Sequence, residues 1–307
     1  MVKTINAEVG GRIIPLGNLD KIFWPFEGYS KNDLIQYYSQ ISPYILKYLQ
    51  DRPLVFVRYP NGINAKHFYQ KNAPANIPDW FNTFEWENAE GKETRFLLVA
   101  EQAALVWLAN QACVEIHPWL SSINSINNPD FVVFDLDPSG DNTFAEVVKI
   151  ALLIKKLLAD INLQTWVKTS GATGLHIYLP IINHYSYEEI RTFAGKVAGI
   201  VNSVIPELTT IERKVASRGK RIYIDYLQNV RGQTICAPYS VRAVDGALVS
   251  TPIRWEEIEE ISPQLFNIKN IQSRLNKTGD IFEAVLTEKQ DIAAAMNELG
   301  ITPVLKH

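Results

Sequence analysis

The stretch that decides the fold is VVFDLDPSGDNTF, which runs from Val132 to Phe144. It begins as an apolar run typical of a buried strand and then turns at Pro138–Gly140. Side chains alternate between the two faces of a strand, so Asp135 and Asp137 lie on the same face. Two neighbouring carboxylates repel one another unless a cation lies between them. The stretch therefore predicts a strand that carries two acids to one site.

Hard carboxylate oxygens suit Mg²⁺ or Mn²⁺, which complete their coordination shells with water and substrate phosphates. The alternative is a turn at the end of the strand, in which Asp135 and Asp137 cap the PSG segment and the helix that follows. A third acid strengthens the metal interpretation. In RIYIDYL, Arg221–Leu227, Tyr223 and Asp225 share one face of a second strand, and Asp225 could complete a two-metal site. An edge-strand salt bridge is the alternative for Asp225.

Between these two strands lies KTSGATGLHIYLP, Lys168–Pro180, which predicts a strand, a glycine-containing turn and a second strand that carries His176. Ser170 and the turn amides could hold phosphate oxygens, with His176 as a further donor. A Ser–His nucleophilic pair and a plain hairpin with a satisfied histidine are the alternatives. Outside this stretch, His117 in EIHPWL and Arg242 in YSVRAVDG are weaker candidates. A guanidinium such as that of Arg242 can grip phosphate through two hydrogen bonds.

The rest of the chain predicts an α+β fold. Three segments, SKND, TFAE and SYEE, begin with a cap residue and have an acid three positions later, and each precedes an apolar-periodic run typical of a helix. A fourth helix is expected to end at Gly300. Strands alternate with these helices, and the two within residues 164–181 are expected to form a hairpin. No GxGxxG or GxxxxGK[ST] motif follows a strand, so a Rossmann or Walker nucleotide site is unsupported.

Composition sets only broad limits. The 307 residues carry a formal net charge of −3, and the five basic residues within 212–221 form a local positive cluster, whose alternative interpretation is a solvated loop. The two cysteines are far apart, which argues against a disulfide framework and favours a reducing, intracellular compartment. No apolar run is long enough to span a bilayer, and we expect no membrane partner.

Together, these motifs resemble the polymerase domain of bacterial ligase D, a branch of the archaeo-eukaryotic primase superfamily used in non-homologous end joining. The resemblance covers roughly residues 15–270. The sequence motifs that carry it are NLDKIFWP, RPLVFVRYPNG, FYQKNAP, LVWLANQACVEIHPWL, FDLDPS, KTSGATGLHIYLP, IDYLQN, APYSVRA and VSTPIRWEE.

The resemblance implies a fold and a catalytic chemistry. It implies a primase-like fold, with an RRM-like catalytic sheet packed against an N-terminal α/β portion. It also implies a nucleotidyltransferase that works with two Mn²⁺ or Mg²⁺ ions bound by Asp135, Asp137 and Asp225. The residues that match contacts to the incoming NTP or dNTP are His117, Ser170, His176, Arg218 and Arg242.

The resemblance further implies DNA with gaps or broken ends as the partner. Lys21 and Lys31 match lysines that grip the 5′-phosphate, and Phe68 and Tyr69 match an aromatic pair that packs on the template. The implied activity is gap filling and end extension with a preference for ribonucleotides. A primase that starts chains de novo and a non-catalytic DNA-end-binding module are the alternatives.

We expect residues 1–307 to form a single polymerase domain, with an N-terminal portion at about 1–125 that contacts DNA and a catalytic portion at about 126–307. The string AVDG, Ala243–Gly246, has alanine where a ligase module has its nucleophilic lysine. We expect neither a ligase nor a nuclease module. Ku and a separate DNA ligase are candidate partners. The expected location is the cytoplasm, in association with the nucleoid.

Overall fold

The computed structural model describes residues 4–88 and 90–301, and the chain divides into two compact units. The first unit comprises Met1–Trp119, Thr234–Ser250 and Gln264–Gly279, and the second comprises Leu120–Gln233, Thr251–Pro263 and Asp280–His307. The first unit therefore takes in two late segments of the chain, one of which carries Arg242. The single polymerase domain expected from the sequence stays a prediction.

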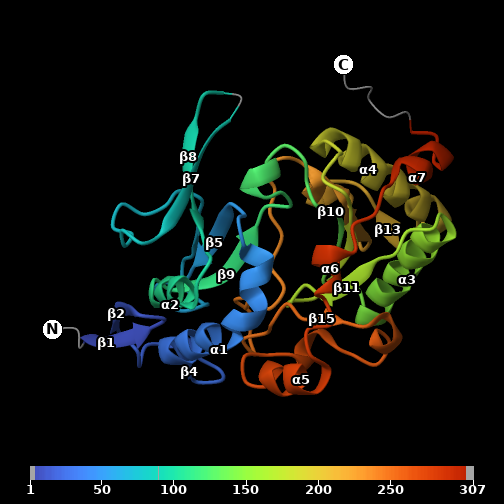
Figure 1. The fold of residues 1–307 in the computed structure, drawn as a ribbon. Helices are drawn as coiled ribbons and strands as arrows, with labels where there is room; N and C mark the ends of the chain where they lie inside the picture. Colours follow the sequence, from blue (N-terminus) through green and yellow to red (C-terminus); the bar gives the residue numbers. More distant parts are fainter. Residues whose placement is uncertain (1–3, 89, 302–307) are drawn as a thin grey trace. The chain divides into compact units, whose positions relative to one another are not determined.

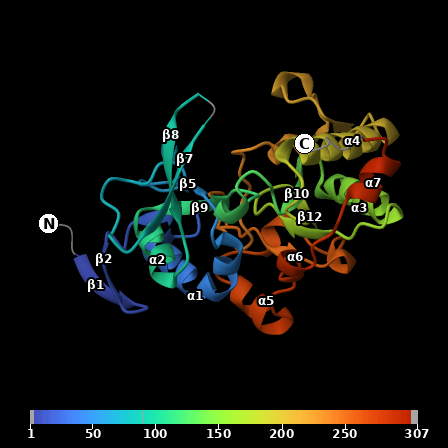
Figure 2. The same cartoon turned by 45° about the horizontal axis from the view of Figure 1, so that its top comes forward.

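In the first unit, the helices are α1 and α2, joined by α5 from the late segments (Figure 1). The bounds of its main elements are β1 Thr4–Val9, β2 Arg12–Gly17, β3 Ile22–Trp24, β4 Tyr29–Ser30, α1 Lys31–Leu49, β5 Leu54–Arg58, β6 Phe68–Gln70, β7 Asn82–Glu87, β8 Glu93–Leu98, α2 Gln102–Asn110, β9 Cys113–Pro118 and α5 Ile271–Thr278. A three-stranded sheet of order β6-β5-β9 carries three of the candidate residues of this unit, Phe68 and Tyr69 on β6 and His117 on β9. Helices α1 and α2 pack against one another and against β9. The β7–β8 hairpin projects from its unit in both views (Figures 1 and 2).

The second unit is built on a six-stranded mixed sheet of order β13-β14-β10-β12-β11-β15. Its main elements are β10 Phe131–Asp137, α3 Phe144–Asp160, β11 Trp166–Thr169, β12 Leu175–Pro180, α4 Tyr187–Val204, β13 Thr209–Thr210, β14 Ile222–Asp225, β15 Pro252–Ile253, α6 Ala284–Thr287 and α7 Ala293–Glu298. Only the β13–β14 pair is parallel. Short 3-10 turns at η2 Val215–Ser217 and η3 Tyr226–Asn229 flank β14. The mixed α and β content confirms the α+β prediction, and the β11–β12 pair confirms the predicted hairpin.

Local sequence explains how these elements begin and which face they bury. Ser30, Thr143 and Ser186 each cap their helix in a reciprocal capping box, as the three sequence signatures predicted. In β10, the side chains of Val132, Phe134 and Leu136 are fully buried, whereas Asp135 is half-buried and Asp137 is exposed. Helix α4 packs on β10, and α3 packs on β12 and on α4. Burial of the apolar face against the helices therefore leaves the acids on the other face of the sheet.

Among the described residues, no helix combines the length and the apolar character that a bilayer span requires.

Candidate active site

Asp135 lies at the centre of a row of polar residues that crosses four neighbouring strands. On one side its Cα pairs with that of His176 on β12, and on the other side with that of Asp225 on β14. His176 in turn pairs with Lys168 on β11. In antiparallel strands, directly opposite side chains lie on the same face of the sheet. The register therefore assembles Lys168, His176, Asp135 and Asp225 into one row.

The interior half of this row is nearly closed to solvent. Lys168 is fully buried, and its Nζ lies 2.8 Å from Nδ1 of His176. On the other side of the ring, Nε2 of His176 lies 3.4 Å from Oδ1 of Asp135. Both ring nitrogens of His176 are thus directed at residues of the row.

Asp225 is a mostly buried carboxylate with several donors around it. Its Oδ1 accepts hydrogen bonds from the Tyr223 hydroxyl at 3.0 Å and from the Leu227 amide at 2.9 Å, and its Oδ2 accepts one from Gln228 at 3.1 Å. Burial and the charge of Asp135 nevertheless raise the pKa of Asp225 above its usual value. A positive charge between the two carboxylates would remove this conflict.

Asp137, at the end of β10, is held by Arg218. The guanidinium Nη1 donates to Oδ2 of Asp137 at 3.0 Å, while the ring of Tyr223 lies 3.8 Å from the guanidinium carbon. The backbone carbonyls of Glu212 and Arg213 accept the other hydrogen bonds of Arg218. The basic cluster of residues 212–221 is therefore not simply a solvated loop, because Arg218 reaches one of the candidate metal ligands.

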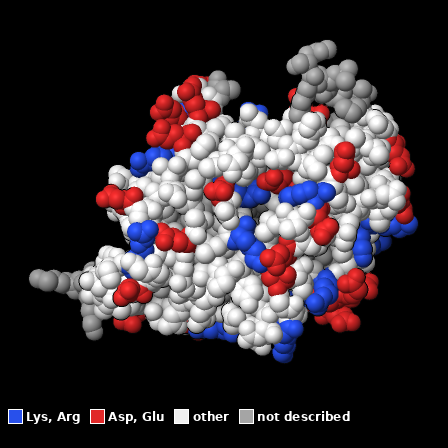
Figure 3. Space-filling view, in the orientation of Figure 1, with Lys and Arg blue, Asp and Glu red and all other residues white. Residues whose placement is uncertain are grey.

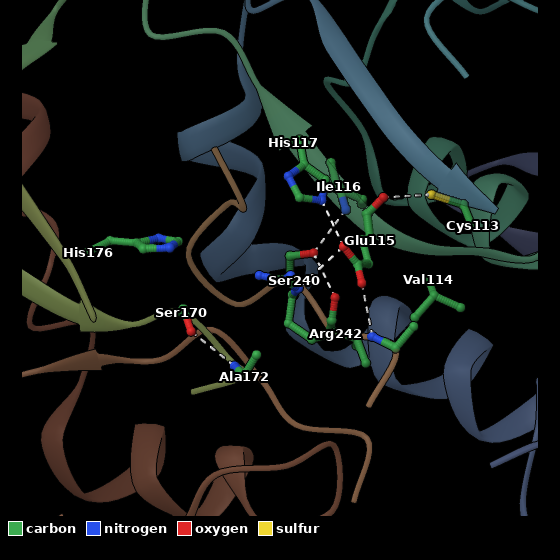
Figure 4. A network of polar contacts seen from close by, with 12 residues as sticks. Cys113, Val114, Glu115, Ile116, His117, Ser170, Ala172, His176, Ser240 and Arg242 are labelled. Carbon is green, nitrogen blue, oxygen red and sulfur yellow. Dashed lines mark hydrogen bonds and ion pairs between the residues drawn. The ribbon is translucent and has the colours of Figure 1, made fainter. Parts of the chain in front are cut away.

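Ser170 organises the turn between β11 and β12. Its Oγ accepts hydrogen bonds from the amides of Ala172 at 3.1 Å and Gly174 at 3.0 Å (Figure 4). Those two amides are therefore engaged by the Ser170 hydroxyl. The phosphate contact expected for Ser170 from the sequence stays a prediction.

The three carboxylates suit a divalent cation chemically, since Mg²⁺ and Mn²⁺ prefer oxygen ligands. They do not form a ready-made site as they stand. Within residues 4–88 and 90–301, no group of three or more His, Cys, Asp or Glu side chains is gathered closely enough to hold a metal ion. The contact of Arg218 with Asp137 and the hydrogen bonds to Asp225 would have to rearrange on metal binding.

In the first unit, His117 and Arg242 share a buried partner, Glu115 (Figure 4). Nε2 of His117 lies 2.9 Å and Nε of Arg242 lies 3.2 Å from Oε2 of Glu115, and the amide of Ala243 donates to its Oε1. Burial alone would raise the pKa of Glu115. The hydrogen bond from His117 and the charge of Arg242 outweigh it and lower the pKa to about 2. Glu115 is thus a permanent anion that holds both candidate nucleotide ligands.

Lys21 and Lys31 form a second cluster in the first unit, at the base of the β3–β4 hairpin. The amide of Lys31 donates to the carbonyl of Lys21, and their ammonium groups donate to the neutral oxygens of Asn61 and Gly17. In the described part of the chain, neither lysine pairs with a carboxylate. Burial and the charge of Lys21 lower the pKa of Lys31 to about 8. Two cations held together by neutral partners make a site that an anion would stabilise.

Phe68 and Tyr69 lie on β6, the edge strand of the three-stranded sheet. Their side chains are 42% and 68% exposed, which leaves aromatic surface available for stacking. Arg58 lies beside Phe68, with its guanidinium carbon 5.2 Å from the ring centroid. The template contact predicted for this pair from the sequence stays a prediction.

Two further residues of these clusters were missed by the sequence analysis. Glu115 is two residues before His117 on β9, so strand alternation would have placed both on one face. Lys168 is the first residue of the KTSG motif, but the sequence does not distinguish it from any polar residue on a strand. Only the pairing of β11 with β12 reveals its contact with His176.

Comparison with known proteins adds independent information. The family model described as LigD, primase-polymerase domain, matches residues 30–282. The bifunctional non-homologous end joining protein LigD of Bacillus subtilis is 33% identical over 286 residues, which are 92% of this chain and 46% of that protein. The multifunctional non-homologous end joining protein LigD of Mycolicibacterium smegmatis is 28% identical over 297 residues, which are 94% of this chain and 39% of that protein. The chain thus spans less than half the length of these relatives.

A solved structure agrees with the family match. The chain is similar to the polymerase domain of Mycobacterium tuberculosis ligase D in complex with DNA, with a TM-score of 0.82 and 27% identity. The likeness covers 90% of this chain and 99% of that one. It confirms the primase-like fold implied by the resemblance.

Proposed function

The chain belongs to the LigD primase-polymerase domain family, and from that premise we propose that it is a template-dependent nucleotidyltransferase that fills gaps and extends broken ends in non-homologous end joining. The observation that carries the proposal is the register that sets Asp135 between His176 and Asp225. It brings candidate metal ligands and a candidate phosphate ligand into one row. A non-catalytic module would have no need of this row.

The carboxylates Asp135, Asp137 and Asp225 would hold two divalent cations, Mg²⁺ or Mn²⁺. When bound, such ions activate the primer 3′-hydroxyl and neutralise the charge of the leaving pyrophosphate. The raised pKa of Asp225 supports this role, because burial and the charge of Asp135 both disfavour the ionised carboxyl and a bound cation would favour it.

The remaining polar groups of the second unit would bind the incoming triphosphate. Ser170 and His176 can each donate one hydrogen bond to a phosphate oxygen. Arg218 would exchange Asp137 for a phosphate oxygen once the charge of Asp137 is neutralised. In the first unit, His117 and Arg242, which both contact Glu115, are proposed nucleotide ligands as well. We further propose a preference for ribonucleotides.

The lysine pair would bind the 5′-phosphate on the far side of the gap. Lys21 and Lys31 lack acidic partners among the described residues, which supports an anionic ligand at this place. Phe68 and Tyr69 would stack on template bases without reading their sequence. The solved relative was determined in complex with DNA. Ku and a DNA ligase are proposed partners in the cytoplasm, at the nucleoid.

The proposal is tested by single-nucleotide incorporation on a gapped duplex. The substrates carry either a 5′-phosphate or a 5′-hydroxyl at the gap, with ribo- or deoxynucleotides and with Mg²⁺ or Mn²⁺. The variant Asp137→Ala should abolish extension, and the control variant Asp160→Ala, which removes an exposed acid of α3, should extend like wild type.

Metal-dependent extension that the 5′-phosphate enhances would support gap filling. Extension on an unprimed single strand would instead support a primase. Tight binding of the gapped duplex with no incorporation under either metal would contradict the enzymatic proposal and leave a DNA-end-binding module.

A further inference from the structure

Lys168 has an environment that a merely structural residue of a β-sheet does not need. Its side chain is fully buried, although lysine is among the residues that are almost never fully buried without a charge or hydrogen-bond partner. Its Nζ lies 2.8 Å from Nδ1 of His176 and 5.9 Å from the centroid of the Tyr178 ring. The position therefore directs a buried ammonium at one nitrogen of a residue in the proposed nucleotide site.

The contact determines how His176 carries its proton. Lys168 as an ammonium has three donors and no acceptor, and Nδ1 of His176 is then the acceptor of the 2.8 Å contact. A neutral imidazole then carries its single proton on Nε2. This proton faces Asp135, whose Oδ1 lies 3.4 Å from Nε2. The ring therefore presents a donor, and not a lone pair, at the edge where the carboxylates and the phosphates would meet.

We propose that Lys168 is a protonated positioning residue, which holds His176 in the Nε2–H tautomer and aims that donor at the site formed by Asp135 and the incoming triphosphate. The inference rests on the proposed function of His176 as a phosphate ligand. It adds a residue and a state of protonation that the family resemblance does not supply. Without Lys168, the imidazole could place its proton on Nδ1 and turn a lone pair towards the anionic phosphate, which would repel it.

The first test is the tautomer itself, measured on the complete protein by long-range ¹H–¹⁵N correlation spectra of the histidine side chains. Which nitrogen holds the proton is inferred from the hydrogen-bond network, so it has to be measured directly. The chain has five histidines, and a His176→Gln variant assigns the signals of His176. We expect an unprotonated Nδ1 and a protonated Nε2 in wild type. This spectrum needs neither metal nor substrate.

The second test compares variants. Lys168→Met keeps the length of the side chain and removes the donor, so we expect the single tautomer to be lost. Mutation of a residue that orients a metal ligand typically costs about 10- to 100-fold in activity. By analogy, kcat/KM for the nucleotide should fall by about that factor in Lys168→Met, with the affinity for gapped DNA unchanged. Lys168→Arg, which retains a donor-only cation, should restore part of the activity. Val167→Ala, a buried neighbour on the opposite face of β11, should change neither the tautomer nor the nucleotide dependence.

The outcomes separate this inference from the proposed function. An Nδ1–H form in wild type would overturn it, and so would a Lys168→Met variant that keeps either the wild-type tautomer or the wild-type kcat/KM. If Lys168→Met does not fold, the wild-type spectrum and the Lys168→Arg variant still decide the matter. If wild type shows the Nε2–H tautomer but incorporates no nucleotide under either metal, the proposed function fails while the positioning of His176 by Lys168 stands.

Discussion

At the scale of single residues, buried charges in this protein are compensated within small clusters. Glu115 is 6% exposed and lies between a histidine and an arginine, whereas Asp225 lies beside another acid. The first cluster lowers a carboxyl pKa and the second raises one. The difference separates a carboxylate that already has its positive partners from one that still needs a cation.

The low pKa of Glu115 predicts a pH-dependent contribution to stability. A carboxyl whose folded pKa is about 2, against an ordinary value of 4.5, stabilises the fold fully above pH 4.5, and the contribution is lost as pH falls towards 2. Its upper limit is about 3 kcal/mol, at about 1.4 kcal/mol per pKa unit. Glu115→Gln should therefore lower the free energy of unfolding clearly at pH 6 and much less near pH 3, as measured by urea denaturation. An equal loss at both pH values would contradict the ionised state of Glu115.

The lowered pKa of Lys31 predicts a pH-dependent preference for phosphorylated ends. Lys31 is charged below its pKa of about 8 and loses its charge above it, so phosphate binding should weaken between pH 7 and pH 9. The ratio of the Kd values for 5′-hydroxyl and 5′-phosphate gapped DNA should fall by up to about tenfold over this range, by linkage. Lys31→Arg is the control, because its guanidinium stays charged. A wild-type ratio that is constant with pH would exclude Lys31 as a phosphate ligand.

At the scale of elements, the site depends on where the β11–β12 turn meets the end of β10. A Cβ added at Gly174 would lie 2.0 Å from the carbonyl oxygen of Leu136. Only glycine permits this close approach of two backbones, which sets the turn that Ser170 holds against the strand that carries Asp135 and Asp137. Asn229 adds a further tie, because its side chain bonds both the amide and the carbonyl of Val133 in β10.

The close approach predicts opposite effects for two glycine variants. Gly174→Ala should destabilise the protein by about 1–3 kcal/mol, the usual cost of overpacking, and should also reduce incorporation because the turn must shift. Gly199→Ala in α4 meets no atom within 4 Å, so it should stabilise the protein by about 0.5–1 kcal/mol through helix propensity. Both changes are measured as shifts of the urea midpoint. A neutral Gly174→Ala variant would show that the approach to β10 is not required.

At the scale of the whole molecule, charge is distributed in small groups. The face drawn in Figure 3 shows basic and acidic side chains interspersed, with acids gathered over the β7–β8 hairpin. With a net charge of −3, no general attraction to DNA is expected, so local clusters must supply the phosphate contacts.

If local clusters supply the phosphate contacts, the affinity for DNA should depend only weakly on salt, and the loss of one contacting lysine should change that dependence measurably. Lys21→Ala should weaken the binding of 5′-phosphorylated gapped DNA and reduce the slope of log K against log salt by about 1. Lys156→Ala removes an exposed lysine of α3 that pairs with Asp160, and it should leave the slope unchanged. Fluorescence anisotropy at several salt concentrations measures both. If the two variants change the slope equally, Lys21 has no specific role.

The sequence by itself determined the features that depend on neighbouring residues. Ser30, Thr143 and Ser186 begin their helices because a cap and an acid three residues later satisfy each other locally. Strand alternation placed Asp135 and Asp137 on one face, and the glycine-containing turn after Lys168–Ser170 predicted the hairpin. The family motifs are likewise short runs of neighbouring residues, and for this reason they could be recognised without a structure.

Only the tertiary structure decided which polar groups meet. Asp135 lies opposite His176 and Asp225, and Lys168 contacts Nδ1 of His176, because strands distant in the chain pair in one register. Arg218 forms an ion pair with Asp137 at the end of the same sheet. A shift of one residue would turn every side chain to the other face of the sheet, so burial of the apolar face selects the register. That burial is a property of the whole sheet and its helices. No local motif encodes it, and for this reason the contact of Lys168 with His176 emerged only from the fold.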